Sequence, residues 1–373
     1  MDALMLPSNW QKVRLGDIAE INPPTIIPNV FYYIDLESVE KGQLLNKQLM
    51  IKNKAPSRAR RLLSKNDILY QLVRPYQRNN YFFTLNGNYV ASTGYAQIRT
   101  LQNPSFLYFA LHSNYFVNAV LDRCEGTSYP AISSNELKKC EVILPPLNEQ
   151  IAIANILSDV DRYLYSLRAL ILKKESVKKA LSFELLSQRK RLKGFNQAWQ
   201  RVRLGDICEI TTGSLDANEM VHYGKYRFYT CAKEYYFIDK YAFDTEAILI
   251  SGNGAYVGYV HYYKGKFNAY QRTYVLDNFS EHIMFVKYFL TMFLQSHIQT
   301  NKNEGNTPYI VMATLKDFEI LLPPLNEQIA IANILSGLDN EIISLKNKKR
   351  QFENIKKALN HDLMSAKIRV LKK

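Results

Sequence analysis

The sequence predicts an α+β protein in which two pseudo-symmetric α/β domains are separated by a long antiparallel two-helix coiled coil. Three observations predict it. A stretch of fifteen residues occurs twice, a shorter stretch precedes each copy, and each copy opens a long run of apolar residues at helical spacing. The expected segments are a first domain over 1–147, a first helix over 148–193, a second domain over 194–325 and a second helix over 326–373.

The two repeats form a frame around dissimilar fillings. Residues 144–158 and 322–336 both read LPPLNEQIAIANILS, and residues 10–18 and 199–207 read WQKVRLGDI and WQRVRLGDI. Because the frame is kept while the filling changes, the chain is expected to hold two domains of one architecture with different tasks.

The variable regions between the repeats predict a mixture of helices and strands. They are rich in Tyr and Phe, and strand-like runs such as residues 67–73 and 247–251 are separated by turn signals at 85–88 and 264–266. A helical stretch follows in each, over 105–121 and 281–300. Each filling is therefore expected to form an α+β domain.

The long repeat opens each expected helix. A Pro-Pro pair ends the preceding strand, after which Asn148 and Asn326 are placed to cap a helix that has Glu149 or Glu327 in its first turn. Apolar residues then recur at threes and fours, as in a coiled-coil seam. Roughly forty residues span about 60 Å, and so long a lysine-rich helix needs a partner helix, which the chain supplies.

Composition excludes several protein classes. With 47% hydrophobic and 22% charged residues among 373, the chain is neither disordered nor collagenous. It has no apolar run of membrane length and no secretory leader, so a cytoplasmic location is expected. The four cysteines lack CxxC or CxxH spacing, so neither a disulfide framework nor a metal site is expected.

The net charge of +14 is concentrated in the two helical segments. Residues 162–193 hold 10 basic and 2 acidic residues, and residues 341–373 hold 10 basic and 3 acidic residues. An anionic neighbour, either DNA or an acidic protein face, is therefore expected beside them.

Polar residues on loops between the strands are candidate base readers. Arginine can bind guanine, and asparagine or glutamine can bind adenine, through paired hydrogen bonds, while glycine lets the backbone approach a ligand closely. An ordinary solvated loop is the competing interpretation of each residue. The DNA-binding candidates are Lys52, Lys54, Arg58, Arg60, Arg61, Arg74, Tyr76, Gln77, Arg78, Asn79, Asn80 and Thr93 in the first domain, and Lys233, Asn253, Tyr256, Gln271, Arg272 and Thr273 in the second.

Catalytic motifs are not found. Residues 22–25 read N-P-P-T, which superficially resembles the N-P-P-aromatic motif of amino-methyltransferases, but Thr25 replaces the aromatic that would stack on a flipped base. There is no F-x-G-x-G loop for S-adenosylmethionine, no phosphate-binding loop and no HExxH. No catalytic residue is therefore assigned, and the chain is not expected to be an enzyme by itself.

On these residues the chain resembles the specificity (S) subunit of type I restriction–modification systems. The resemblance covers nearly the whole chain, although the fillings contribute almost no transferable motif. It is carried by the paired anchors, the paired PPLNEQIA helices, Arg74-Pro75, and the segments 125–127 and 304–307 ahead of each Pro-Pro.

The resemblance implies a function. Each variable domain would be a target recognition domain reading one half of a bipartite duplex DNA site, with the helices setting the spacer. Two methyltransferase (M) subunits would dock, and restriction/motor (R) subunits are further expected partners. S-adenosylmethionine, ATP and Mg are expected on those partners, and no cofactor on this chain. The docking candidates are Asn148, Glu149, Gln150, Asn326, Glu327 and Gln328.

Two other hypotheses stay open from the residues. A protein-only helical scaffold would form complexes that do not respond to DNA. A stand-alone DNA methyltransferase or nuclease would show turnover without partners.

Overall fold

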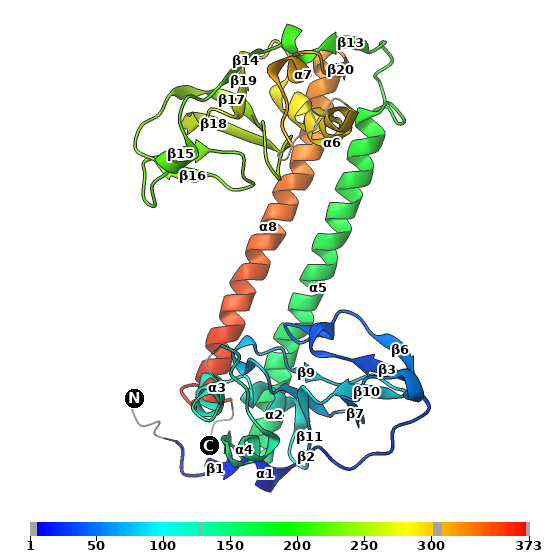
Figure 1. Cartoon of the computed structure of the whole chain (residues 1–373), viewed down its shortest axis with the longest axis vertical. Coiled ribbons are helices and arrows are strands. Elements are labelled where there is room, and N and C mark those ends of the chain that lie inside the picture. The colour runs from blue at the N-terminus through cyan, green and yellow to red at the C-terminus, as the bar shows by residue number, and fades with distance from the viewer. Residues whose placement is uncertain (1–5, 127, 301–307, 371–373) are drawn as a thin grey trace. The chain divides into compact units, whose positions relative to one another are not determined.

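The computed structural model describes residues 6–126, 128–300 and 308–370. The chain divides into unit 1, residues 1–168 with 347–373, and unit 2, residues 169–346. Two long helices, α5 (Leu147–Leu186) and α8 (Leu325–Met364), contribute to both units (Figure 1). The units do not coincide with the four segments expected from the sequence, because each half of a helix packs with the domain next to it.

Unit 1 has two four-stranded sheets and short helices. The first sheet, in the order β6-β3-β10-β7, contains one parallel pair, β3 with β10, and the second has the order β2-β11-β8-β9. A core of α2, α3 and the adjoining parts of α5 and α8 packs on the second sheet through residues such as Phe106, Phe116, Leu157 and Leu363. The elements are β1 (Gln11–Arg14), α1 (Leu15–Ile18), β2 (Ala19–Ile21), β3 (Val30–Ile34), η1 (Leu36–Ser38), β4 (Val39–Glu40), β5 (Gln43–Leu44), β6 (Gln48–Ile51), η2 (Lys52–Lys54), β7 (Ala59–Leu62), β8 (Ile68–Gln71), η3 (Pro75–Gln77), β9 (Tyr81–Phe82), β10 (Tyr89–Ser92), β11 (Tyr95–Thr100), α2 (Pro104–Ala110), α3 (Asn114–Leu121), α4 (Ser134–Lys139) and β12 (Glu141–Leu144).

Unit 2 is built around one six-stranded sheet in the order β14-β19-β17-β18-β15-β16. Its core joins Ile248 and Leu276 of the sheet to Phe285 and Leu290 of α6 and to Leu335 of α8. The elements are β13 (Gln200–Arg203), η4 (Leu204–Asp206), β14 (Glu209–Thr212), η5 (Ala217–Glu219), β15 (Tyr226–Tyr229), β16 (Tyr236–Ile238), β17 (Phe243–Ser251), β18 (Val260–Ala269), β19 (Thr273–Asp277), α6 (Ile283–Thr300), α7 (Met312–Lys316) and β20 (Glu319–Leu322).

The repeated stretches meet in space as paired strands. In unit 1, β1 pairs antiparallel with β12 with Gln11 opposite Leu144, and in unit 2, β13 pairs antiparallel with β20 with Gln200 opposite Leu322. The short repeat therefore pairs, in each unit, with the strand that leads directly into the long repeat. This explains why both stretches are duplicated together, and it confirms the predicted α+β fold with two related domains.

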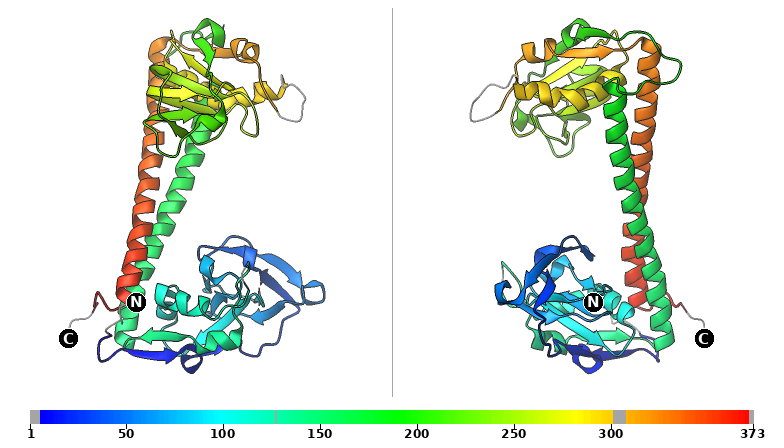
Figure 2. Two further views of the ribbon diagram at one scale, coloured as in Figure 1. Left: turned by 60° about the vertical axis from the view of Figure 1, so that its left-hand side comes forward. Right: turned by 90° about the vertical axis from the view of Figure 1, so that its right-hand side faces the viewer.

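The two long helices run antiparallel, as predicted. In unit 1, Asp161 of α5 pairs with Lys356 of α8 and Tyr163 contacts Phe352. In unit 2, later positions of α5 meet earlier positions of α8, since Lys174 pairs with Glu341. Figure 2 shows the helices side by side in two views.

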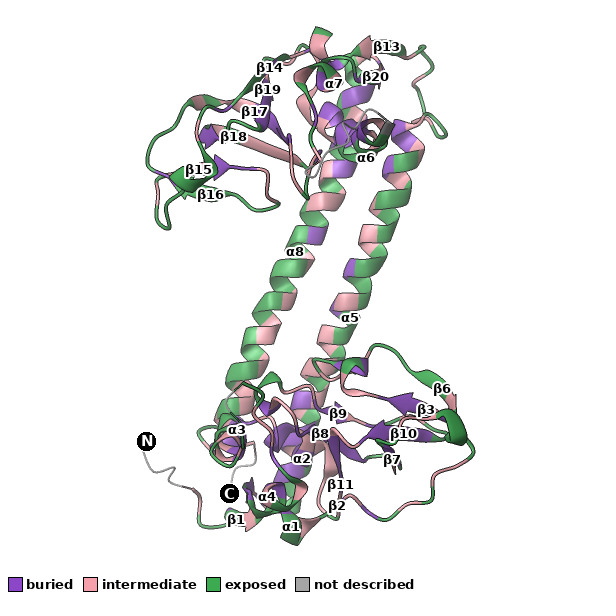
Figure 3. Cartoon of the chain, viewed as in Figure 1, coloured by how far each residue is buried: buried purple, intermediate pink, exposed green. Residues whose placement is uncertain are grey.

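The sequence misplaced details of both helices. Each begins one residue earlier than expected, so Asn148 and Asn326 lie inside the first turn rather than at the N-cap, and the carbonyl groups of Pro146 and Pro324 accept the first helical hydrogen bonds. Part of the predicted apolar seam is also wrong, because ion pairs from lysines occupy contact positions between the helices. The exposed members are Leu170, Val177, Ile334 and Ile355. Figure 3 shows that exposed residues occur along both α5 and α8.

Some of the helix charge is used internally. Lys174 and Lys178 of α5 and Lys346 of α8 form ion pairs with acidic side chains of the other helix within unit 2. In unit 1, Lys356 of α8 does the same with Asp161. Part of the basic excess thus already has an anionic neighbour within the chain.

Candidate nucleic-acid interface

A buried carboxylate stands in the first turn of α5. Glu149 is 2% exposed and accepts a hydrogen bond from Trp10 Nε1 at 3.1 Å. Arg369, which follows α8, donates from Nε and Nη2 to the two carboxylate oxygens at 2.6 and 2.9 Å. This two-pronged geometry compensates the buried charge.

The same arrangement, which we call the carboxylate clamp, recurs at the start of α8. Glu327 is 0% exposed, and Trp199 Nε1 donates to it at 3.2 Å. Arg191, which follows α5, donates from Nε and Nη2 at 3.1 and 2.6 Å. Arg191 and Arg369 stand 178 positions apart, the offset of the long repeat.

The clamps correct the predicted docking residues. Glu149 and Glu327 are buried in the clamps, so their side chains are not available to a partner. Gln150 Nε2 donates to the Pro145 carbonyl at 2.9 Å, and Gln328 Nε2 donates to the Pro323 carbonyl at 2.8 Å, so these side chains are also occupied. The sequence could not separate these inward residues from the outward ones. Those that are exposed are Leu147, Asn148 and Ile151 in the first copy and Leu325, Asn326 and Ile329 in the second.

Unit 1 has a polar edge, edge 1, where the chain leaves β8 over residues 72–74. The Leu72 N–H donates to the Gly94 carbonyl at 2.9 Å, and the Arg74 N–H donates to the Pro130 carbonyl at 2.7 Å. The Leu72 carbonyl accepts from the Ile132 N–H at 3.0 Å. Three separate segments are therefore tied together by main-chain hydrogen bonds, which leaves their side chains free to vary.

Unit 2 has the same edge, edge 2, where the chain leaves β17 over residues 252–254. The Gly252 N–H donates to the Arg272 carbonyl at 2.8 Å, and the Gly254 N–H donates to the Pro308 carbonyl at 2.9 Å. The Gly252 carbonyl accepts from the Ile310 N–H at 2.9 Å. Edges 1 and 2 thus share every main-chain link although their side chains differ.

The loop after edge 1 holds several of the predicted base readers in internal contacts. Arg78 donates to the His112 carbonyl at 2.9 Å and to Asn114 Oδ1 at 2.8 Å, and burial lowers the pKa of its guanidinium. Asn80 is buried and its Oδ1 accepts from the Gln71 N–H at 2.8 Å. Assigning Arg78 and Asn80 to base reading is therefore corrected: these polar side chains hold the loop together.

Other residues of this loop are held less tightly by internal contacts and stay at least partly exposed. Gln77 Oε1 accepts from Gln71 Nε2 at 2.9 Å, and Asn79 Oδ1 accepts from the Lys41 N–H at 3.1 Å, but Gln77 stays exposed and Asn79 partly so. Tyr76 is exposed, and the Arg74 guanidinium carbon lies 4.2 Å from the ring centre of Tyr129. Tyr129 was missed from the sequence, where a lone Tyr before Pro carried no signal.

Three residues of the basic cluster of unit 1 line a cleft. Lys52, Arg60 and Arg61 line this cleft of about 460 Å³, and burial lowers the pKa of Arg61. Lys54 is exposed. The Arg58 guanidinium pairs with Asp35 at 2.8 Å. The Arg58 carbonyl accepts a hydrogen bond from the Thr93 N–H, so Arg58 and Thr93 lie next to Gly94. Lys52, Arg60 and Arg61 thus share one cleft, and base reading by this cluster stays a prediction.

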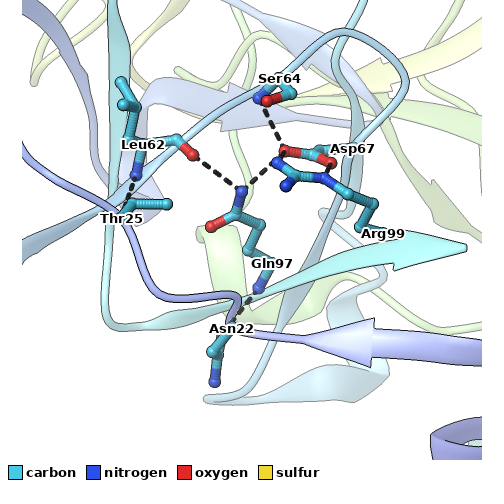
Figure 4. Close-up of polar contacts among 7 residues, drawn as sticks. All are labelled: Asn22, Thr25, Leu62, Ser64, Asp67, Gln97 and Arg99. Atoms are coloured by element: carbon cyan, nitrogen blue, oxygen red, sulfur yellow. Dashed lines mark hydrogen bonds and ion pairs between the residues drawn. The ribbon is translucent and has the colours of Figure 1, made fainter.

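The N-P-P-T segment also lines this cleft, and Figure 4 shows its role. The Oδ1 atom of Asn22 accepts from the Gln97 N–H at 2.9 Å, and Gln97 Nε2 donates to Asp67 at 2.7 Å. Arg99 donates twice to the same Asp67 carboxylate, at 2.9 Å each. Asn22 is thus committed to joining the segment to β11, which supports the interpretation of a structural turn.

In unit 2 the predicted residues gather at edge 2 with one correction. Lys233 Nζ lies 5.1 Å from the ring centre of Tyr256, and Arg272 is exposed. Asn253 forms an antiparallel bridge with Tyr309, and Gln271 Nε2 donates to Asp216 at 2.6 Å. Thr273 is 0% exposed at the start of β19, an interior strand between β14 and β17, so its side chain is not available to DNA.

Within the described ranges, no group of three or more His, Cys, Asp or Glu side chains is placed to hold a metal ion, and all four cysteines are free. Over the same ranges, no helix has the length and apolar character needed to cross a membrane. Two residue groups cited for the resemblance, 304–307 and Thr127, lie outside the described residues.

Two edges with the same main-chain links and different side chains define a protein that uses one domain architecture twice. A family model, the type I restriction modification DNA specificity domain, matches residues 7–175 and 196–354. The chain belongs to this family. The resemblance inferred from the sequence is thereby confirmed.

The names of similar proteins agree with this family assignment. The chain is 38% identical to the EcoDI type I restriction enzyme specificity subunit of Escherichia coli, over 45% of this chain and 37% of that protein. It is 24% identical to the MjaVIII specificity subunit of Methanocaldococcus jannaschii, over 99% and 95% of the two chains. These names match the prediction of a specificity component rather than a catalytic one.

Solved structures share the fold. The S subunit of a type I system from M. genitalium gives a TM-score of 0.66 at 18% identity, covering 95% of this chain and 96% of that one. A chain from a study of complex assembly and conformational transition of the type I R-M system gives 0.58 at 22% identity, covering 96% and 98%.

Proposed function

We propose that this chain is the non-catalytic DNA sequence-recognition subunit of a type I restriction–modification complex, and that edges 1 and 2 each read one half of a bipartite duplex site. The observation that carries this proposal is the pair of edges with identical main-chain links and different side chains. Two readers of one architecture can present different hydrogen-bonding groups to two different half-sites. The antiparallel helices α5 and α8 set the spacer.

The exposed start of each long helix is the docking site of one methyltransferase subunit. Leu147 is 55% exposed and Leu325 51%, although both are large and apolar. Asn148 and Ile151 lie beside Leu147, and the same three residue types recur in the second copy. A duplicated apolar surface next to an amide suits two copies of one protein partner.

The chemistry belongs to those partners. S-adenosylmethionine, ATP and Mg bind to the methyltransferase and motor subunits, and the complex works in the cytoplasm. The R subunits join the same assembly.

Methylation mapping of host DNA tests the recognition role. A strain lacking this chain is expected to lose adenine methylation at one bipartite sequence, and a plasmid copy is expected to restore it. Replacing residues 207–321 with the corresponding region of another specificity subunit should change one half of that sequence only. Methylation that persists without the chain, or both halves changing together, contradicts the proposal.

Native mass spectrometry tests docking. In the purified complex, the double variant L147E/I151E is expected to bind one methyltransferase subunit instead of two, because two buried carboxylates would oppose the apolar contact. L325E/I329E should do the same at the other site. L172E, which changes another exposed leucine of α5, is the matched control and should keep both subunits. Two bound subunits in either double variant would contradict this docking site.

A further inference from the structure

Edges 1 and 2 place arginine and glycine at exchanged positions. At the position whose N–H binds the proline carbonyl, edge 1 has Arg74 and edge 2 has Gly254. A second position lies on the neighbouring segment, where a carbonyl accepts a hydrogen bond from the N–H of Leu72 or Gly252. Edge 1 has Gly94 at this position and edge 2 has Arg272. Each edge therefore carries one arginine, in edge 1 on the segment that leaves the strand and in edge 2 on the neighbouring segment bonded to it.

The backbone of Arg74 carries a cost that its counterpart avoids. Arg74 has φ 53° and Gly254 has φ 79°, so both adopt the left-handed conformation. Glycine adopts it freely, whereas an arginine there suffers a steric penalty from its Cβ. Strained residues of this kind are concentrated at functional sites, where the side chain is needed despite the cost.

Both arginines keep their hydrogen-bonding capacity. The Arg74 guanidinium stacks on the exposed ring of Tyr129, and Arg272 is exposed. Among the described residues, neither side chain forms an ion pair with a carboxylate. The planar donors of a stacked or open guanidinium fit the two acceptors of guanine.

A tyrosine is the same in both edges. Tyr76 follows Arg74 by two residues and is 50% exposed, and Tyr256 follows Gly254 by two residues and is 43% exposed. Identical side chains at equivalent places cannot encode two different half-sites. The part of duplex DNA that both half-sites share is the sugar–phosphate backbone, to which a tyrosine hydroxyl can bind.

We infer a division of labour, which rests on the proposed recognition function. Tyr76 and Tyr256 contact the sugar–phosphate backbone of their half-sites and position the two edges. Arg74 reads a base in the half-site of unit 1, and Arg272 reads a base in the half-site of unit 2, from a different segment of the equivalent edge.

The arginine test uses the full complex with its methyltransferase subunits. Four duplexes carry the mapped site intact, with one half scrambled, with the other half scrambled, or with both scrambled, and fluorescence anisotropy gives each affinity. R74G is expected to lower discrimination in one half by roughly 10- to 100-fold and to leave the other half unchanged, and R272G should do the reverse. R74G should fold, because glycine relieves the left-handed strain.

R74K is the matched charge control. It keeps the positive charge but loses the forked donors, so it is expected to lose discrimination as R74G does. If R74K keeps full discrimination, or if R74G weakens all four duplexes equally, Arg74 contacts phosphate and the base-reading assignment is wrong.

The tyrosine test gives a different signature. Y76A and Y256A are each expected to weaken all four duplexes by the same factor and to leave every affinity ratio unchanged. A changed ratio, or unchanged affinities, would contradict the anchor role. Failure of the underlying proposed function would look different, since the unsubstituted complex would then bind all four duplexes equally.

Discussion

The two carboxylate clamps have the same contacts but are assembled from different parts of the chain. At Glu327, Arg191 and Trp199 belong to one connecting segment and stand eight positions apart. At Glu149, Trp10 and Arg369 come from opposite ends of the sequence. The frame, rather than the local order of residues, therefore determines the geometry.

The difference has an energetic meaning. Arg191 and Trp199 lie in the one segment that connects α5 with β13, whereas Arg369 follows α8 and Trp10 precedes β1, so the fold alone brings these two residues together. Contacts between distant segments must offset a larger chain-closure entropy. The clamp at Glu149 is thus expected to matter more to unit 1 than its counterpart does to unit 2.

The largest expected effect comes from removing an arginine. R369A should lower the free energy of unfolding of unit 1 by about 3–5 kcal/mol, because it leaves the buried Glu149 carboxylate without its cation. R191A should destabilise unit 2 by less. Hydrogen exchange over peptides of each unit measures both changes.

K193A is the control for both variants. Lys193 is exposed, so its loss should change either unit by less than about 0.5 kcal/mol. If R191A costs as much as R369A, chain connectivity has no influence on the clamps.

A smaller effect is expected from the tryptophans. W10F removes one hydrogen bond to a charged group and should cost unit 1 about 1.5–3 kcal/mol. W199F should cost unit 2 less, because Trp199 is only half-buried and loses less packing. Hydrogen exchange compares the loss of unfolding free energy in W10F with that in W199F. An equal or larger loss in W199F would show that burial of the tryptophan ring does not make the two clamps differ.

The smallest expected effect is a dependence on pH in unit 1. Burial, with the positive charges of Lys356 and Arg78, lowers the pKa of His112 to about 4. The folded state therefore keeps His112 neutral while the unfolded chain binds a proton below its ordinary pKa of 6.5. Stability contributed above pH 6.5 is lost as the pH falls toward 4, by about 1–2 kcal/mol at pH 5.

Thermal unfolding at pH 7.5 and pH 5 measures this loss. H112Q should reduce it, whereas H222Q, which replaces an exposed histidine, should not. An unchanged pH dependence in H112Q would assign the loss to other groups.

The repeated part of the fold could be predicted because its sequence occurs twice in the chain. Paired strands, antiparallel helices and two related domains all follow from repeats that must pack alike. The sequence also held a sign of the carboxylate clamps, because Arg191 and Arg369 are separated by the offset of the long repeat. The sequence alone does not show, however, whether a glutamate is buried or exposed.

The proposed reading residues were only partly predictable from the sequence. Arg74 and Arg78 lie in one loop and have the same chemistry, yet Arg78 is bound to His112 and Asn114 while Arg74 is not. Burial by the fold decides such cases. The equivalence of the edges was hidden because β8 and β17 follow spacings that differ from the repeat offset, although Pro130 and Pro308 keep it.

The main-chain links of the two edges have a consequence for how such proteins change. These links let arginine and glycine exchange places between the edges. Gly252 is not open to such exchange, since a Cβ there would lie 2.3 Å from the Arg272 carbonyl oxygen. On the proposed reading role, one or two codon changes at the exchangeable positions can alter the groups offered to DNA while the core and the long helices stay as they were.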